Sequence, residues 1–382
     1  MRTAITEMFG IDVPILAFSH CRDVVAAVSK AGGMGVLGAV AHSPEQLEID
    51  LRWIESEIGD RPYGVDLIVP ARYAGSDEGG LTAEAIHALI PPEHVAFVED
   101  ILRRYEVPDL VGDDLARSSG GIATGGAGTI FSAGRADPQL EIALAHRTTL
   151  VVNALGPPTE HMIGRAKEEG RRIGALAGTA IHAERHVNAG VDLIVAQGSE
   201  AGGHTGEIGS MVLIPEIVDA VGDVPVLGAG GIGRGRQMAA AMALGAQGVW
   251  CGSVWLTTEE AETHPVVKEK MLRARSSDTV RSRSRTGKPA RQLRSAWTDE
   301  WDDPATPAPL AMPLQPVLVD EALVRIDRAA HRGGSGAEKL ANYFVGQIVG
   351  SMNRVKPAAE VVYEMIDEYI DVVQSLARQL AE

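Results

Sequence analysis

Eight short apolar runs alternate along this chain with segments of helical periodicity. The runs occupy residues 13–18, 35–39, 63–69, 149–155, 173–178, 191–196, 225–229 and 248–252. Helical patterns follow most of them, at residues 22–30, 44–58, 158–170, 180–188, 211–221 and 234–244. Strands that alternate with helices indicate a parallel sheet, and eight such units predict an α/β fold, a (β/α)8 TIM barrel.

Two further segments lie outside this repeat. Residues 70–135, after the third strand, hold glycine-rich stretches and one helical pattern, which predicts a large insertion or lid subdomain. Residues 273–382 hold a basic stretch, a proline-rich stretch and two helical patterns, the last of them amphipathic. We expect a C-terminal helical extension there that packs on the barrel, which itself is expected over residues 1–69 and 136–272.

The composition narrows the class of partner. A net charge of -16 argues against nucleic acid and anionic membranes, which leaves small molecules as the expected partners. No run of eighteen apolar residues predicts a membrane span, and the N-terminus lacks the pattern of a signal peptide. The two cysteines, Cys21 and Cys251, give neither a disulfide framework nor a metal-ligand spacing, so we expect a cytoplasmic protein without a metal.

A glycine-rich loop follows the sixth run and contains one histidine. Its sequence is Gln-Gly-Ser-Glu-Ala-Gly-Gly-His-Thr-Gly, from Gln197 to Gly206. Glycines remove side chains where another group must approach the backbone, and an imidazole with a pKa near neutrality suits proton transfer. His204 is therefore a candidate catalytic base beside a cofactor. The alternative interpretation is a flexible turn with a solvated histidine.

A second glycine pattern, G-x-G-x-x-G at residues 228–233, follows the seventh run. A Rossmann dinucleotide site also needs an acidic residue about 20 positions later, but residues 224–258 contain no Asp or Glu. A barrel phosphate site fits better, because the loops after the seventh and eighth strands supply Gly230, Gly231, Gly252 and Ser253. The alternative is that these glycines only permit tight turns.

Taken together, residues 192–204, 225–232 and 239–253 resemble the nitronate monooxygenase family, formerly called 2-nitropropane dioxygenases. The early segments 14–18 and 31–38 are similar to the family's first βαβ unit, so the resemblance spans most of residues 10–295. It implies an FMN-dependent barrel enzyme, related to the flavin-dependent enoyl-ACP reductases, in which the flavin carries the redox chemistry.

The resemblance also implies roles for individual residues. His204 matches the catalytic base. Positions that match or adjoin the family's FMN contacts are Ala17, Phe18, Asp66, Gln197, Gly198, Gly202, Gly203, Gly230, Gly231, Trp250, Cys251, Gly252 and Ser253. The implied reaction is oxidation of an alkyl nitronate or nitroalkane with O2 to a carbonyl compound and nitrite, and family members are often homodimers.

Other activities stay open. One alternative is an NAD(P)H-dependent flavin reductase or dehydrogenase that acts on an enoyl or acyl thioester, and another is a flavin-binding protein without turnover. His20 lies where the family often has an apolar wall, so it is a tentative substrate contact, unless it only caps the following helix. The basic stretch 273–294 either binds a phosphorylated substrate tail or pairs with the protein's own carboxylates, and Gln347 is a further candidate near the site.

Overall fold

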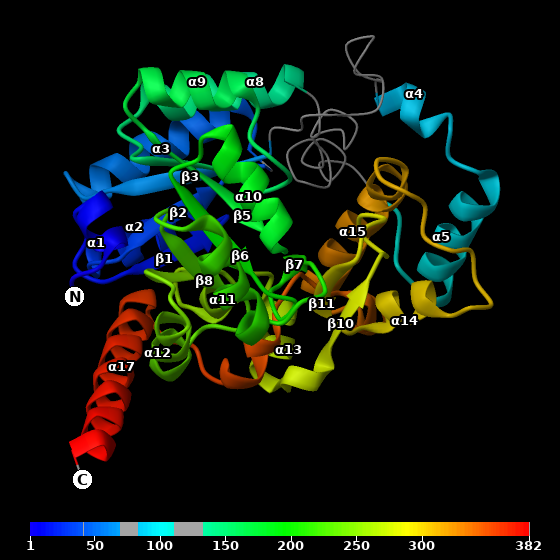
Figure 1. Ribbon diagram of the computed structural model, residues 1–382. Coiled ribbons are helices and arrows are strands. Elements are labelled where there is room, and N and C mark those ends of the chain that lie inside the picture. The colour runs from blue at the N-terminus through cyan, green and yellow to red at the C-terminus, as the bar shows by residue number, and fades with distance from the viewer. Residues whose placement is uncertain (41, 69–82, 111–132, 382) are drawn as a thin grey trace.

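The computed structural model describes residues 1–40, 42–68, 83–110 and 133–381. Its centre is a closed barrel of eight parallel strands, in the order β1-β2-β3-β4-β5-β6-β8-β9. The helices that surround the barrel can be followed in Figure 1. The barrel strands are β1 (Ile15–Ser19), β2 (Met34–Gly38), β3 (Tyr63–Leu67), β4 (Leu150–Asn153), β5 (Arg172–Ala177), β6 (Leu193–Gln197), β8 (Val226–Ala229) and β9 (Gly248–Cys251). The predicted TIM barrel is confirmed, with each strand at its predicted run.

Several of the surrounding helices begin at a hydroxyl residue that caps them. Thr3, Ser43, Thr159 and Thr179 each accept a hydrogen bond from a backbone N–H in the first helical turn. The helices up to the eighth barrel strand are α1 (Ala4–Phe9), α2 (Arg22–Lys30), α3 (Pro44–Ile58), α4 (Ala83–His87), α5 (Pro92–Arg104), α8 (Ala133–Ala145), α9 (Glu160–Glu168), α10 (Ala180–Ala189), α11 (Ser210–Val221) and α12 (Gly235–Ala243).

Side chains alternate between the barrel interior and the layer under the helices. On β1, Leu16 packs in the interior cluster, whereas Ile15 and Ala17 pack in the outer cluster. The same alternation places Trp250 inside the barrel and Cys251 outside it. This pattern decides which strand-end side chains can face the barrel mouth.

Among the described residues, three short strands lie outside the barrel, and they were not predicted. They are β7 (Gly203–His204), β10 (Thr279–Ser282) and β11 (Ala290–Leu293), which form an antiparallel sheet in the order β10-β11-β7. Only β7 belongs to a barrel loop, since the other two strands come from the C-terminal extension. The sheet therefore joins the extension to the loop that carries the histidine.

The extension and the described part of the 70–135 insertion share a second hydrophobic core. Ile101 on α5 and the fully buried Trp297 and Ile326 of the extension belong to this cluster. Arg325 on the extension forms an ion pair with Glu99 on α5, at 3.2 Å. The extension's helices are α13 (Pro265–Arg273), α14 (Ala296–Asp302), α15 (Leu314–His331), α16 (Ser335–Leu340) and α17 (Ala358–Ala381), with a short 3-10 helix at η5 (Gln347–Ser351).

The last helix, α17, returns to the outside of the barrel, where it packs on α12 and α2 (Figure 1). Gly235 permits the close crossing, since a Cβ there would lie 2.1 Å from the Met365 carbonyl oxygen. Glu368 holds the crossing by accepting hydrogen bonds from Arg234 and Arg236 at 2.6 Å each. Within the described residues, no helix is long and apolar enough to cross a bilayer.

Candidate active site

The histidine predicted to be catalytic lies at the barrel mouth, on a strand that the extension helps to form. His204 is the second residue of β7, and its register partner on β11 is Ala290. Its Nε2 atom lies 2.8 Å from the Thr286 hydroxyl, and the Phe344 ring lies beside it at a centroid distance of 6.4 Å. We call β7, β11 and the turn at residues 286–288 the histidine platform. His204 is thus fixed in place by contacts with residues of the extension.

The environment of His204 keeps its imidazole neutral. Burial lowers its pKa to about 4, and the nearby Lys288 cation acts in the same direction. Our expectation of a pKa near neutrality is therefore corrected by the structure. At neutral pH the ring can accept a proton, and a negative charge bound beside it would raise its pKa again.

A carboxylate anchors the loop that leads to the platform. Glu200 accepts hydrogen bonds from the backbone N–H of Ser210 at 3.0 Å and from its hydroxyl at 2.9 Å. Gly198 must be a glycine here, because a Cβ would lie 2.2 Å from the Ser210 Oγ. At Gly202 a Cβ would lie 2.9 Å from the backbone nitrogen of Gly346. Both glycines are thus required by packing within the chain.

The other predicted glycines lie in the two loops after β8 and β9. Gly230 and Gly231 have positive φ angles of 99° and 68°, so both favour glycine. In the described residues, the backbone N–H groups of Gly231, Gly252 and Ser253 have no hydrogen-bond partner. The Ser253 hydroxyl accepts from the Gly346 N–H at 2.8 Å, which leaves its own hydrogen to donate. We call these four residues the glycine cradle.

The cradle has hydrogen-bond donors that could hold a phosphate group. Unpaired N–H groups and a free hydroxyl hydrogen are the donors that bind a phosphate without a lysine. Gly203 supplies further room, since no atom lies within 4 Å of the position its Cβ would occupy. The donor set of the cradle and the space beside Gly203 therefore suit a ligand that carries a phosphate.

An aromatic pair lines the barrel interior at the mouth. The rings of Phe18 and Trp250 stack with a centroid distance of 6.0 Å and an interplanar angle of 24°. The His20 ring meets Phe18 edge-on at 5.1 Å. Gly38 makes room for both, since a Cβ there would lie within 2.8 Å of either ring. Phe18, His20 and Trp250 are thus brought together.

His20 does not cap the helix that follows it. Helix α2 has Cys21 at its N-cap position and no side-chain capping bond. The His20 Nδ1 instead donates a hydrogen bond to the Gly38 carbonyl at 2.7 Å. Burial lowers its pKa, so the ring is neutral and its Nε2 is an acceptor.

Four predicted positions remain, namely Asp66, Gln197, Ala17 and Cys251. Asp66 is buried in β3, where burial raises the pKa of its carboxyl well above the usual range. Gln197 ends β6 and is half-buried beside Ala229 of β8. Ala17 and Cys251 point into the layer under the helices, so only their backbone atoms can face the mouth.

Most arginine side chains of the basic stretch 273–294 bind other groups of the protein itself. Arg285 is held by the Asn342 side chain at 2.7 Å and lies over the Phe344 ring at 5.5 Å. Arg291 donates to the Ser199 carbonyl at 2.9 Å. Two of the arginines pair with carboxylates, in Arg273–Glu269 and Arg294–Asp299. Arg291 thus joins the extension to the loop after β6, whereas Arg273 and Arg294 form surface pairs within the extension.

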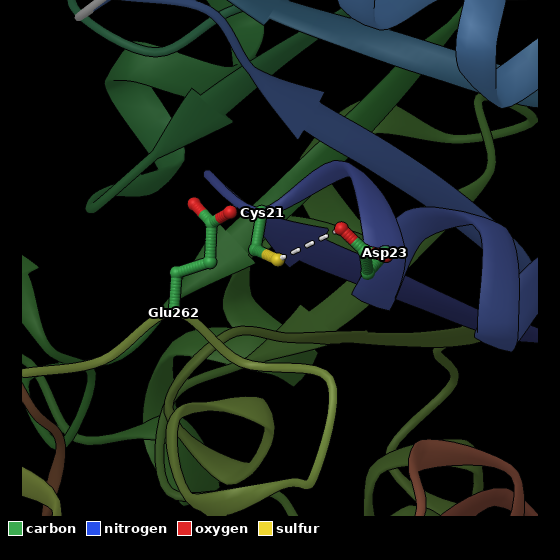
Figure 2. A group of neighbouring side chains, drawn as sticks. All are labelled: Cys21, Asp23 and Glu262. Carbon is green, nitrogen blue, oxygen red and sulfur yellow. Dashed lines mark hydrogen bonds between the residues drawn. The ribbon is translucent and has the colours of Figure 1, made fainter. Parts of the chain in front are cut away.

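Cys21 lies in a small cluster with Asp23 and Glu262, shown in Figure 2, whose potential ligand atoms lie within 4.8 Å of one another. Burial raises the pKa of the Cys21 thiol, and its Sγ donates to the Glu260 carbonyl at 3.0 Å. A protonated thiol that donates its hydrogen is a poor metal ligand. The contact ties the start of α2 to the loop before α13.

Residue-level reasoning from the sequence missed the contacts that hold His204. Thr286 and Gly346 lie more than 80 positions from it and touch the site, and Glu200 anchors its loop. Of the extension residues at the site, only Gln347 was a candidate from the sequence. The Gln347 N–H donates to the Glu200 carbonyl at 2.9 Å, which places this residue beside the loop.

Comparison with known proteins gives one consistent result. The family model described as nitronate monooxygenase matches residues 2–368. A candidate monooxygenase of Mycobacterium tuberculosis is 58% identical over 98% of both chains. A Staphylococcus saprophyticus protein named as a nitronate monooxygenase is 30% identical over 84% of this chain and 88% of its own length.

Two solved structures are similar over nearly the whole chain. Nitroalkane oxidase from Streptomyces ansochromogenes has a TM-score of 0.77 at 26% identity, covering 98% of this chain and all of its own. FabK from Thermotoga maritima has a TM-score of 0.72 at 27% identity, covering 99% of both chains. Both likenesses include the extension as well as the barrel.

Proposed function

Because the chain belongs to the nitronate monooxygenase family of flavin-dependent oxidoreductases, we propose that it binds FMN and oxidises alkyl nitronates or nitroalkanes with O2. The products would be a carbonyl compound and nitrite. The observation that carries this proposal is a neutral, half-buried imidazole on the histidine platform, at the same barrel mouth as the glycine cradle. When bound, the flavin supplies the redox chemistry.

Each part of the mouth has a task in this proposal. The cradle donates hydrogen bonds to the FMN phosphate, and the glycines of the 197–206 loop allow close approach of the cofactor. Phe18 and Trp250 provide an apolar surface that excludes water. His204 accepts the proton from the carbon next to the nitro group of a neutral substrate.

The low pKa of His204 is compatible with this task. Proton transfer from a neutral nitroalkane leaves an anionic nitronate beside a newly formed imidazolium. The two opposite charges attract in a partly water-excluded site, which raises the pKa of the imidazolium as the proton moves. A substrate that is already a nitronate needs no proton removal, so its oxidation should depend less on His204.

Anaerobic mixing of the purified protein tests the proposal. We expect a nitronate to bleach the flavin absorbance, while NAD(P)H alone leaves it unchanged; admission of O2 should then release nitrite. Rapid bleaching by NAD(P)H without a nitronate would instead support the enoyl or acyl thioester reductase. The released cofactor should be FMN by mass spectrometry.

His204→Asn tests the role of the base. We expect the variant to keep its flavin but to lose about 10²- to 10⁴-fold in turnover of neutral nitroalkanes, the usual contribution of general-base catalysis. The exposed His182 on α10 offers a matched control, since His182→Asn should leave the rate unchanged. Wild-type turnover by His204→Asn would remove this residue from the mechanism.

A further inference from the structure

Three hydrogen-bonding groups surround the hydroxyl of Thr286. Its Oγ1 lies 2.8 Å from His204 Nε2, 3.1 Å from the Lys288 carbonyl oxygen and 3.4 Å from the Lys288 nitrogen. A hydroxyl has one hydrogen to donate and two lone pairs that accept. The carbonyl oxygen can only accept and the backbone N–H can only donate, so the direction of two of these contacts is fixed.

The single hydroxyl hydrogen can be directed to the Lys288 carbonyl or to the His204 ring, and the direction of the third contact depends on which of them receives it. With its hydrogen directed to the Lys288 carbonyl, the Thr286 hydroxyl can only accept from His204. We propose that Thr286 is a positioning residue that holds the neutral His204 ring in the tautomer with its hydrogen on Nε2, so that Nδ1 is the atom that accepts the substrate proton. This inference deepens the proposed function and rests on it for its catalytic meaning.

The turn that carries Thr286 is rigidly placed. Gly287 has a φ of 76°, and a Cβ there would lie 2.2 Å from the Leu310 carbonyl oxygen, so the turn is pressed against the extension. Arg283 holds the turn from the other side, donating from Nε to the Gly287 carbonyl at 2.8 Å. The hydroxyl is therefore presented to His204 by a fixed backbone.

The second ring nitrogen of His204, Nδ1, can accept a proton from the substrate. In the described part of the chain, Nδ1 of His204 makes no hydrogen bond, and it is not among the buried atoms that lack a partner. This nitrogen is consequently accessible to solvent. Which ring nitrogen carries the hydrogen is set by the bond that the other one makes. In the opposite tautomer, Nδ1 would already carry a hydrogen and could not accept one.

Side-chain ¹⁵N NMR of the full-length protein, labelled at histidine, tests the tautomer without reference to activity. Comparison with His204→Asn assigns the signals of this ring. Between pH 6 and 8 we expect a protonated Nε2 and an unprotonated Nδ1, with an Nε2 hydrogen that exchanges slowly with water. A protonated Nδ1 in the neutral ring would overturn the inference, even if nitronates prove to be substrates.

Substitution of Thr286 tests the positioning role. Thr286→Val removes the acceptor, so we expect exchange of the Nε2 hydrogen to quicken about tenfold or more and kcat on nitroalkanes to fall about tenfold, with little change in KM. Thr286→Ser keeps the hydroxyl and should restore both. Unaltered exchange and kcat in Thr286→Val would overturn the role. Absence of nitronate turnover in the wild type would refute the proposed function, while the NMR result would still decide the tautomer.

Discussion

The glycine cradle and the histidine platform lie at one barrel mouth but are built in different ways. The cradle comes from two consecutive barrel loops, at residues 230–231 and 252–253, and its shape follows from local backbone angles. The platform pairs His204 with Ala290 and also depends on Thr286 and Phe344. These three partners of His204 belong to the extension. All four cradle residues thus lie in barrel loops, whereas His204 is held in place by contacts with a second folded unit.

A few backbone contacts connect the two regions. The Gly346 N–H donates to Ser253 of the cradle, and the Gln347 N–H donates to Glu200 of the histidine loop. Glu200 in turn holds Ser210, whose hydroxyl lies 2.9 Å from the Gly230 carbonyl. Variants in the cradle or in the platform should affect flavin binding or turnover separately. Variants within the connection should reduce both.

The largest effect is expected at the connection itself. A Cβ at Gly346 would lie 2.6 Å from the Glu200 carbonyl oxygen, so Gly346→Ala must push the extension away from both regions. A displacement of about 1 Å in an active site costs about 100-fold in rate, so we expect kcat/KM to fall by about that factor, together with weaker flavin binding. Steady-state kinetics and flavin titration measure the two losses.

Gly333→Ala is the matched control for this prediction. It also lies in the extension, at the end of α15, and no atom is within 4 Å of the position of its Cβ. Its φ of 83° makes a side chain there cost about 1–2 kcal/mol of unfolding free energy, but this strain is local and does not move the extension. Gly333→Ala should leave flavin affinity and turnover unchanged. Loss of only one function in Gly346→Ala would mean that the two regions are not connected through this segment.

A smaller and more selective effect is expected in the cradle. Gly231→Ala forces a side chain into a positive φ and brings its Cβ to 3.1 Å from the Glu200 Cβ. Gly170→Ala is the control, because Gly170 has nearly the same φ, 66°, and no atom lies within 4 Å of the position of its Cβ. Both variants should lose about 1–2 kcal/mol of unfolding free energy. Only Gly231→Ala should weaken flavin binding, by about tenfold, in a fluorescence titration; equal affinities would exclude the cradle as a cofactor site.

The smallest effect concerns the charge beside the platform. Lys288 is exposed, and its cation helps to lower the pKa of His204 to about 4. In Lys288→Met this pKa should rise, so the acidic limb of the kcat/KM profile for nitroalkanes should move to higher pH. Solvent screening limits the shift to about half a unit.

The dependence of the acidic limb on salt concentration checks this prediction. The wild-type limb should also move to higher pH in high salt, whereas the limb of Lys288→Met should not. Lys339→Met, at another exposed lysine of the extension, serves as the control. A profile of Lys288→Met that coincides with the wild-type profile at low salt would show that burial alone sets this pKa.

The same contrast explains which features could be predicted from the sequence. The eight barrel strands are continuous apolar runs, so their pattern is local and was found at each position. Strand β7 has only two residues, too few for any periodicity, and exists because residues 203 and 204 pair with residues 291 and 290. Such a long-range pairing leaves no local signal in either segment.

The glycines show a second limit of sequence reasoning. Gly198 and Gly202 were grouped with the cofactor-binding glycines, but the chain's own packing already requires them to lack a side chain. Gly231 instead combines a positive φ with an unpaired N–H. A sequence shows that a side chain is absent, whereas only the structure shows which group occupies that space.

The division between barrel and extension also sets an order during synthesis. The last barrel strand, β9, ends at Cys251, so the barrel can close once these residues have left the ribosome. The partners of His204 at residues 286, 290 and 344 emerge later. A nascent chain can therefore form the loops of the glycine cradle before the partners of its histidine have been made, and the histidine platform is completed only with the final third of the polypeptide.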